Sequence, residues 1–289
     1  MKGRAPTIRQ RATAKLVRWQ SRLSQKLLLP FARIPYPERW IFIVGCYNSG
    51  TSLLSKVLSE HPKIAGLPDE GIYFTDALPY PEQFSWPRMW TRCLSEVRID
   101  PNHDLERQVN RIKKQWALAY RPLQPNLLEK SVANSARIPF LEKYFRPAYF
   151  IHIVRNGYAV SEGIHRRATP SQWNNPEFDD EYPIALCAEQ WRATEELIES
   201  DRGKTVNFHS IKYEDLTSDP LRVINGIHSF LGLESADRAL VEKLWFVSDR
   251  NESIRNMNDN SIARLSVADI DEIQNIAGPM LEKRGYVRP

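Results

Sequence analysis

A glycine-rich loop in this sequence has the spacing of a phosphate-binding site. The loop, Gly45-Cys-Tyr-Asn-Ser-Gly-Thr-Ser52, follows the apolar run Trp40-Ile-Phe-Ile-Val44 and precedes a helical pattern. Backbone N–H groups in such a loop, together with the helix N-terminus, can enclose a phosphate. The Gly-x4-Gly spacing is that of a P-loop, but Thr51 stands where a P-loop has lysine. A kinase that uses magnesium-ATP as its donor needs that lysine to neutralise the β and γ phosphates, so we expect a donor with fewer charges.

A second anion-binding residue is predicted at the end of another apolar run. Arg155 follows Ala148-Tyr-Phe-Ile-His-Ile-Val154, and a helical pattern begins at Gly157. Open α/β sheets bind ligands at the carboxyl ends of their strands, and a guanidinium group suits bidentate contact with a phosphate. We therefore interpret Arg155 as a phosphate ligand rather than as half of a surface ion pair.

The elements that must position these residues alternate between strands and helices. This alternation indicates an α/β fold of three layers with a central parallel sheet. The predicted strands are 40–44, 63–65, 127–130, 148–154 and 205–211, and the predicted helices are 51–60, 157–167, 267–284 and one that begins at Asp219-Pro220. Two segments interrupt the pattern: residues 79–125 form a predicted helical insertion, and residues 169–183 form a predicted mobile loop. Both should shape a ligand pocket.

The charges are unevenly distributed along the chain. The 289 residues carry a net charge of +5, but residues 1–37 contain nine basic side chains and no acidic one. Residues 38–289, which we expect to form a single domain, are left with 31 basic and 35 acidic side chains. Because a nucleic-acid-binding body should be basic across a face, this distribution argues against a nucleic-acid partner.

The basic N-terminal extension, residues 1–37, contains an amphipathic helical pattern from Ile8 to Leu29. Three interpretations stay open: contact with a membrane surface or an acidic partner, a helix packed on the body with a solvated basic face, and a mitochondrial presequence. The three cysteines lie far apart, which argues against disulfides and a zinc site. Since the sequence has no apolar run long enough to span a membrane or to form a signal peptide, we expect a soluble cytoplasmic protein.

Three ordered segments resemble the family of sulfotransferases that use 3′-phosphoadenosine 5′-phosphosulfate (PAPS). Ile41-Phe-Ile-Val-Gly45 with Asn48-Ser-Gly-Thr-Ser52 is similar to the family's 5′-phosphosulfate loop. Ile151-His-Ile-Val-Arg155, continuing to Ser161, is similar to its 3′-phosphate segment. Tyr213-Glu-Asp-Leu216, with Asp219-Pro220 and Phe230-Leu-Gly-Leu233, is similar to the block before its late helix. The matches run from residue 40 to residue 233, are closest to bacterial and to tyrosylprotein or carbohydrate branches, and imply the P-loop-like sulfotransferase architecture.

The resemblance implies a set of cofactor contacts and no metal. The implied contacts of the 5′-phosphosulfate are Ser49, Gly50, Thr51 and Ser52. Arg155 would bind the 3′-phosphate, and Tyr213 would lie near the adenine or else serve as a core aromatic. Ser261 and Arg264, in a segment similar to one that closes over the nucleotide in some branches, would be further 3′-phosphate contacts. The product would be adenosine 3′,5′-bisphosphate.

The sequence departs from the family pattern at two positions. Many members have lysine or arginine before the Ser-Gly-Thr unit, where this chain has Asn48, which can donate a hydrogen bond but supplies no charge. Members also have a serine eight residues after the 3′-phosphate arginine, where this chain has Gly163. Ser161 lies about 200° away from that position on a helix, so its hydroxyl is a poor replacement.

The catalytic residues must position the acceptor, stabilise charge on the leaving oxygen and take the acceptor proton. Lys130, at a predicted strand end, resembles the family's second lysine and is our candidate for the leaving oxygen. Glu70, in the turn after the second strand, stands where one branch has a catalytic glutamate and is our candidate base. Asp69 is an adjacent competitor, and His61 and His165 are alternatives that we interpret as structural.

Together these residues predict a metal-free PAPS-dependent sulfotransferase that acts on a hydroxyl or amine of a small-molecule, carbohydrate or peptide acceptor. Its candidate catalytic residues are Glu70, Lys130 and Asn48. Two alternatives from other classes stay open. The neutral Asn48 and the missing hydroxyl at Gly163 would also suit a P-loop-like module that binds a phosphorylated ligand without chemistry, and a nucleotide kinase is the less favoured alternative because of Thr51.

Overall fold

A central sheet of five parallel strands organises the protein. The computed structural model describes residues 27–120, 122–247 and 250–289. The strands are β1 (Arg39–Val44), β2 (Ile64–Gly66), β3 (Asn126–Glu129), β4 (Ala148–Val154) and β5 (Asn207–Lys212), in the spatial order β2-β3-β1-β4-β5. The central strand β1 pairs in parallel register with β3 on one side and β4 on the other. The phosphate loop, which follows β1, and Arg155, which follows β4, therefore lie at neighbouring strand ends.

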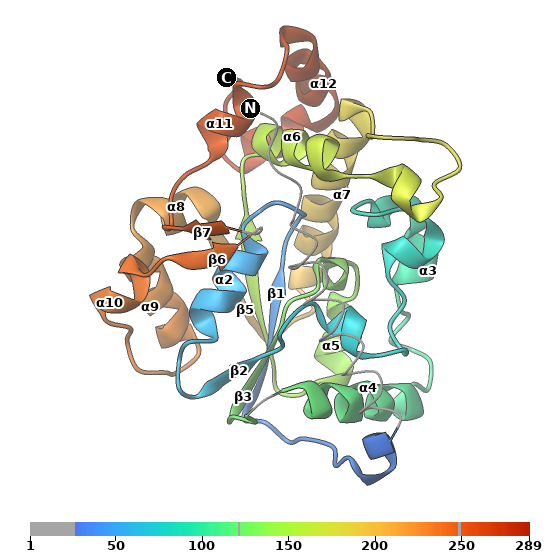
Figure 1. The fold of residues 1–289 in the computed structure, drawn as a ribbon, viewed down its shortest axis with the longest axis vertical. Helices are drawn as coiled ribbons and strands as arrows, with labels where there is room; N and C mark the ends of the chain where they lie inside the picture. The colour runs from blue at the N-terminus through green and yellow to red at the C-terminus, as the bar shows by residue number, and fades with distance from the viewer. Residues whose placement is uncertain (1–26, 121, 248–249) are drawn as a thin grey trace.

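Helices cover both faces of this sheet, which confirms the three-layer α/β fold. On one face, Ile41 and Ile43 of β1 pack with α2 (Thr51–Leu58), α8 (Tyr213–Ser218) and α9 (Pro220–Phe230). On the other face, Trp40 and Phe42 pack with α4 (Glu106–Ala119), α5 (Ile138–Tyr144) and the end of α7 (Ile184–Arg202). Figure 1 shows α2 and α9 on one side of the strands and α5 and α7 on the other. The alternation of buried side chains along β1 thus serves two cores.

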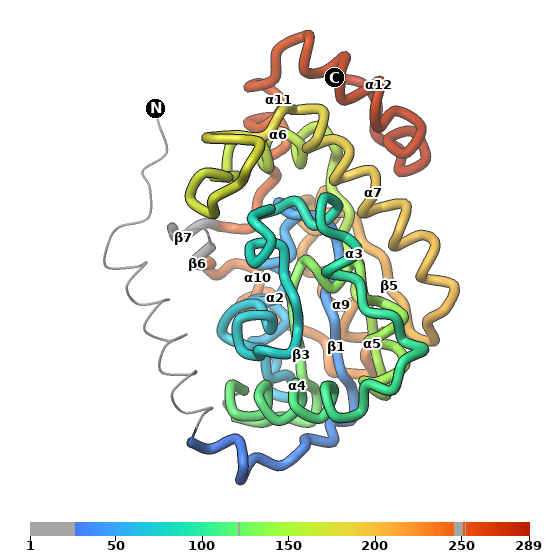
Figure 2. The backbone as a smooth tube through the Cα atoms, turned by 90° about the vertical axis from the view of Figure 1, so that its right-hand side faces the viewer, coloured from blue at the N-terminus to red at the C-terminus, as the bar shows by residue number. Residues whose placement is uncertain are grey.

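A group of helices lies beyond the carboxyl ends of the strands. It consists of α6 (Gly157–Arg167), α11 (Asn258–Ile262), α12 (Val267–Lys283) and one end of α7, and Figure 2 shows α7 running from this group along the body. No helix was predicted from the sequence over the range of α7. Its buried positions Ile184, Cys187, Ala188 and Trp191 nevertheless have helical spacing, which would have predicted the first turns of this helix.

The predicted helical insertion consists mainly of short elements around one long helix. Residues 79–125 contain η3 (Pro81–Phe84), η4 (Trp90–Cys93), α3 (Leu94–Val97) and α4. In the 169–183 segment, η6 (Pro170–Trp173) is followed by Phe178, whose ring contacts Trp86 of the insertion edge-on at 6.2 Å. The two segments therefore touch, while the mobility of the second stays a prediction.

The remaining elements are short. They are η1 (Leu29–Phe31), η2 (Gly71–Phe74), η5 (Val132–Ala136), α10 (Arg238–Glu242) and an antiparallel ribbon of β6 (Trp245–Val247) and β7 (Arg250–Glu252). The predicted cap of α9 is confirmed, because the Asp219 side chain accepts a hydrogen bond from the Arg222 N–H. Most of the predicted N-terminal amphipathic helix lies outside the described residues. Among the helices that are described, none combines the length and the apolar composition that crossing a bilayer requires.

Candidate functional site

The phosphate loop is held at both ends by contacts that only glycine permits. At its start, the Gly45 N–H donates to Ser135 Oγ over 2.9 Å, and this hydroxyl donates to the Gly45 carbonyl over 3.0 Å. A Cβ on Gly45, whose φ is 152°, would lie 2.4 Å from the Ile153 carbonyl oxygen. A Cβ on Gly50, whose φ is 94°, would lie 2.9 Å from the Tyr213 ring. The Gly-x4-Gly spacing therefore reflects close packing against β4 and Tyr213.

The residues predicted to contact the 5′-phosphosulfate gather at the N-terminus of α2. Gly50 is the N-cap, and Thr51 and Ser52 form the first turn, where backbone N–H groups have no carbonyl partner within the helix. Ser49 is fully buried, and its Oγ has no hydrogen-bond partner among the described residues. A buried hydroxyl without a partner is costly, and beside a helix N-terminus it fits an anionic group such as a phosphate.

Arg155 lies directly beside this loop. Its Nη1 donates to the Asn48 carbonyl over 2.7 Å, and its Nε donates to Asn258 Oδ1 over 2.8 Å. The guanidinium carbon lies 4.4 Å from the centre of the Tyr213 ring. Burial lowers the pKa of this guanidinium group, whose Nη2 is buried and has no partner among the described residues. The remaining nitrogen is therefore suited to an anion.

Asn258, which the sequence analysis did not identify, links Arg155 to late parts of the chain. Its Nδ2 donates to Glu214 Oε1 over 2.6 Å, and the backbone N–H of Asn156 donates to the same oxygen over 3.0 Å. Glu214 Oε2 accepts a hydrogen bond from the Tyr286 hydroxyl over 3.0 Å. The orientation of Arg155 thus depends on a network that reaches from β4 to the residues after α12.

The three other predicted cofactor contacts lie around Arg155. Tyr213 is buried, and its ring lies between Gly50 and the guanidinium group, so it supports Arg155. Ser261 is buried in α11, which packs against α6. Arg264 is half-exposed, and its Nη1 lies 3.4 Å from Glu162 Oε1. Their contacts with a nucleotide stay predictions.

The two predicted catalytic residues form an ion pair. Lys130 follows β3 at its carboxyl end, next to the end of β1, and Glu70 directly precedes η2. Lys130 Nζ donates to Glu70 Oε1 over 2.8 Å, and the two side chains are only 10% and 19% exposed. Burial and the charges of Glu82 and Glu70 raise the pKa of Tyr47, a buried residue of the phosphate loop. Because the loop follows β1 and Lys130 follows the adjacent strand β3, the ion pair and the loop lie at neighbouring strand ends.

Glu129, a fully buried carboxylate, orders the turn that carries Glu70. The Gly71 N–H donates to Glu129 Oε1 over 2.7 Å, and Ser131 and Asn134 also donate to this carboxylate. Burial raises its pKa to about 7, although the hydrogen bonds from Ser131 and Gly71 act in the opposite direction. In the sequence, this role is indicated by a charged residue in an otherwise apolar strand, because a buried carboxylate needs hydrogen-bond donors around it.

The two departures from the family pattern lie against each other. A Cβ on Gly163 would lie 3.0 to 3.1 Å from side-chain atoms of Asn48, so the absence of a side chain at 163 makes room for Asn48. Asn48 Oδ1 accepts hydrogen bonds from Arg167 over 3.2 Å and from Arg88 over 3.4 Å, two arginines that the sequence analysis did not identify. The Ser161 hydroxyl donates to the Gly157 carbonyl within α6, so it does not replace the missing hydroxyl.

The alternative bases have other surroundings. His61 follows the C-terminal end of α2, away from the loop, and its Nε2 lies 3.6 Å from Glu234. His165 lies 2.7 Å from the Tyr182 carbonyl through Nδ1 and 3.5 Å from Glu181 through Nε2. The structural roles of both histidines stay predictions.

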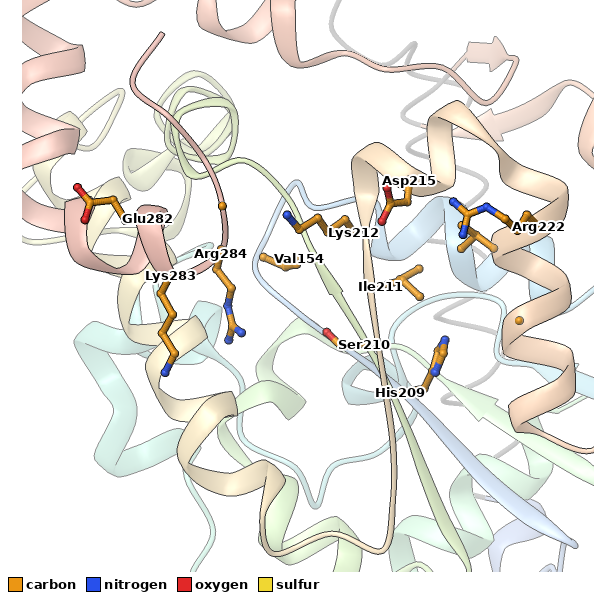
Figure 3. Close-up of a pocket in the computed structure, with 13 residues that line it drawn as sticks. Val154, His209, Ser210, Ile211, Lys212, Asp215, Arg222, Glu282, Lys283 and Arg284 are labelled. Carbon is orange, nitrogen blue, oxygen red and sulfur yellow. The ribbon is translucent and has the colours of Figure 1, made fainter.

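A cavity of about 670 Å³ lies elsewhere, at the open edge of the sheet. Figure 3 shows His209, Ser210 and Lys212 of β5 between Arg222 of α9 and the end of α12. The described residues that line it include none of the predicted site residues. Although this cavity is large, we do not assign it as the candidate active site, because the predicted site residues lie elsewhere.

A parallel sheet that presents a phosphate loop, an arginine and a buried ion pair at its carboxyl edge can bind an anionic group and stabilise charge near it. The profile of the Sulfotransferase family matches residues 40–237, and the chain belongs to that family. The family recognised from the sequence is therefore confirmed.

Known relatives agree with this assignment. The chain is 26% identical over 168 residues to an omega-hydroxy-beta-dihydromenaquinone-9 sulfotransferase of Mycobacterium tuberculosis, a match of 55% of this chain and 41% of that protein. The match thus spans less than half of the relative's length. The fold resembles the sulfotransferase domain of the Synechococcus PCC 7002 olefin synthase, with a TM-score of 0.54, 22% identity and coverage of 89% of this chain and 99% of that one. A sulfotransferase from Alicyclobacillus acidocaldarius has a TM-score of 0.51, 15% identity and coverage of 86% and 94%.

Proposed function

We propose that this sulfotransferase uses PAPS as its donor and transfers the sulfuryl group, without a metal ion, to a hydroxyl or amine of an acceptor. The observation that carries the proposal is the pairing of Glu70 and Lys130 beside a loop whose buried polar atoms have no partner among the described residues. In PAPS the sulfuryl group is attached to the 5′-phosphate, so the bond between sulfur and the bridging oxygen would break and adenosine 3′,5′-bisphosphate would leave. The described residues contain no group of three potential metal ligands.

Each site residue has a role that its contacts permit. Residues 49–52 would bind the 5′-phosphosulfate through N–H groups and hydroxyls, and Arg155 would bind the 3′-phosphate through Nη2. Lys130 would stabilise the charge that develops on the leaving oxygen. Glu70 accepts from Lys130 through Oε1, so Oε2 would take the acceptor's proton. Asn48 would donate its buried Nδ2 to a sulfuryl oxygen.

The acceptor would be a small molecule, a carbohydrate or a peptide. A relative is named for a hydroxylated menaquinone derivative, which favours a small-molecule alcohol. The helical insertion and the 169–183 segment touch at Trp86 and Phe178, so their aromatic rings would form one wall of the acceptor pocket.

Calorimetry with adenosine 3′,5′-bisphosphate tests the donor. We expect binding that chelation of divalent metals leaves unchanged, whereas a magnesium-dependent preference for ATP would indicate a kinase instead. Transfer of labelled sulfate from PAPS into cell extract then tests for chemistry, because a module that only binds the nucleotide would label nothing.

Substitution at the ion pair tests the catalytic assignments. We expect Glu70→Gln and Lys130→Ala each to lower kcat by a factor of about 100 or more, because each removes a proton acceptor or a charge needed in the transition state. Glu96→Gln, which removes a carboxylate from the exposed surface, is the control. Unchanged turnover in both variants would show that other residues perform the chemistry.

A further inference from the structure

Arginines from three separate segments converge on Asn48. Arg88 comes from the helical insertion, Arg155 follows β4 and Arg167 ends α6. Arg155 Nη1 lies 2.7 Å from the Asn48 carbonyl, and Nη1 atoms of Arg167 and Arg88 lie 3.2 Å and 3.4 Å from its Oδ1. One neutral residue thus holds three guanidinium groups beside the phosphate loop.

The positive charge of this cluster is only partly balanced. Two carboxylates act on the cluster, and both already have partners. Glu162 is buried and is shared by Arg166 at 2.5 Å and Arg264 at 3.4 Å, while Glu214 accepts hydrogen bonds from Asn258, Asn156 and Tyr286. Although Arg167 is exposed, desolvation by the protein around its guanidinium group, followed by the charges of Arg88, Arg166 and Arg155, lowers its pKa to about 10, so this group is still cationic at neutral pH. Guanidinium groups gathered in this way repel one another unless an anion lies between them.

The backbone at Arg88 and an unpaired nitrogen of Arg155 also fit an anion-binding site. Arg88 has a φ of 61°, a left-handed conformation that is unfavourable for arginine and that persists mainly where the surroundings require it. Arg155 is 7% exposed, and its Nη2 has no partner among the described residues. Arg88 and Arg167, in contrast, are accessible enough to reach a ligand from solvent.

We propose that Arg88 and Arg167 act with Arg155 as ligands of a second anionic group of the donor nucleotide, its 3′-phosphate. This inference rests on the proposed function. The N–H groups at the start of α2 would hold one anion, and a dianionic phosphate beside them would accept hydrogen bonds from several guanidinium groups at once. The two arginines would then supply 3′-phosphate interactions in place of the hydroxyl that is missing at Gly163.

Two nucleotides that differ only in the 3′-phosphate provide the test. Calorimetry would compare adenosine 3′,5′-bisphosphate with adenosine 5′-monophosphate for the wild type, Arg88→Gln and Arg167→Gln. Loss of a charge-assisted hydrogen bond should weaken bisphosphate binding by about 10-fold to 100-fold in each variant. Binding of the monophosphate should change by less than about 2-fold. Arg92→Gln is the matched control, because Arg92 lies in the same insertion and pairs with Glu177 instead.

Thermal unfolding of each variant shows whether it is folded, and Arg88→Lys and Arg167→Lys, which keep the charge, should recover part of the lost affinity. Equal losses for the two nucleotides would overturn the inference, since the arginines would then act on the 5′ group or on the fold. Unchanged bisphosphate affinity in both glutamine variants would overturn it as well, while leaving the proposed function intact. A wild type that does not bind the bisphosphate at all would contradict the proposed function itself.

Discussion

Replacement of Glu129 by glutamine should alter how the stability of the protein depends on pH. Burial raises the pKa of Glu129 from 4.5 to about 7. The lower value applies to the unfolded state and the higher one to the folded state. Between them the folded state holds a proton that the unfolded state has released, so the contribution of Glu129 to stability is fully present below the lower pKa. It is lost as the pH rises through the higher one. The difference between the two pKa values corresponds to about 3 kcal/mol in the free energy of unfolding.

Urea unfolding of the wild type and of Glu129→Gln would be compared at about pH 5 and about pH 7.5. The amide of the variant faces the Asn134 amide and adds a cost of about 1 kcal/mol that is the same at both pH values. The wild type should therefore lose roughly 2.4 kcal/mol relative to the variant between these two pH values, slightly less than the full difference because pH 5 already lies above the unfolded pKa. Glu96→Gln controls for the loss of one carboxylate from the surface. A difference between wild type and Glu129→Gln that is equal at the two pH values would refute the reasoning.

Three further substitutions test other features. Burial lowers the pKa of His228 from 6.5 to about 4, so its contribution to stability is present above the unfolded pKa and is lost as the pH falls. The wild type should lose about 3 kcal/mol relative to His228→Leu between those two pKa values, as measured by denaturant unfolding. Gly157→Ala places a Cβ 2.8 Å from the buried Trp191 and should lower the free energy of unfolding by about 1 to 3 kcal/mol. An unchanged melting temperature would contradict the packing described. Gly50→Ala strains the loop against Tyr213 and should weaken calorimetric binding of adenosine 3′,5′-bisphosphate more than it lowers the melting temperature.

The fold was largely predictable because its strands and loop are encoded locally. The helix predicted from Gly157 to Arg167 has those bounds in the structure, and the strand from Ala148 to Val154 is likewise correct. α7 was overlooked because polar residues such as Gln190 and Glu195 are buried between its apolar positions and weaken its amphipathic pattern. Their burial depends on partners far along the chain, such as Arg284 for Glu195 and Thr91 for Gln190.

The candidate site was predictable only where a short motif carried it. Glu70 and Lys130 were chosen by their resemblance to the family, and the structure places them in hydrogen-bond contact, although their catalytic roles stay predictions. Arg88, Arg167 and Asn258 belong to no local motif. Each reaches the loop only because the insertion, the end of α6 and α11 fold over the same edge of the sheet.

The network around Glu214 has a consequence for protein synthesis. The phosphate loop and its flanking strands are translated early, but Arg155 is oriented by Asn258, and the carboxylate that holds Asn258 is also bound by Tyr286. A growing chain on the ribosome can therefore assemble the sheet before its anion-binding arginine is oriented. Tight nucleotide binding should begin only after these late residues have emerged, so capture on a nucleotide resin would separate finished molecules from nascent ones.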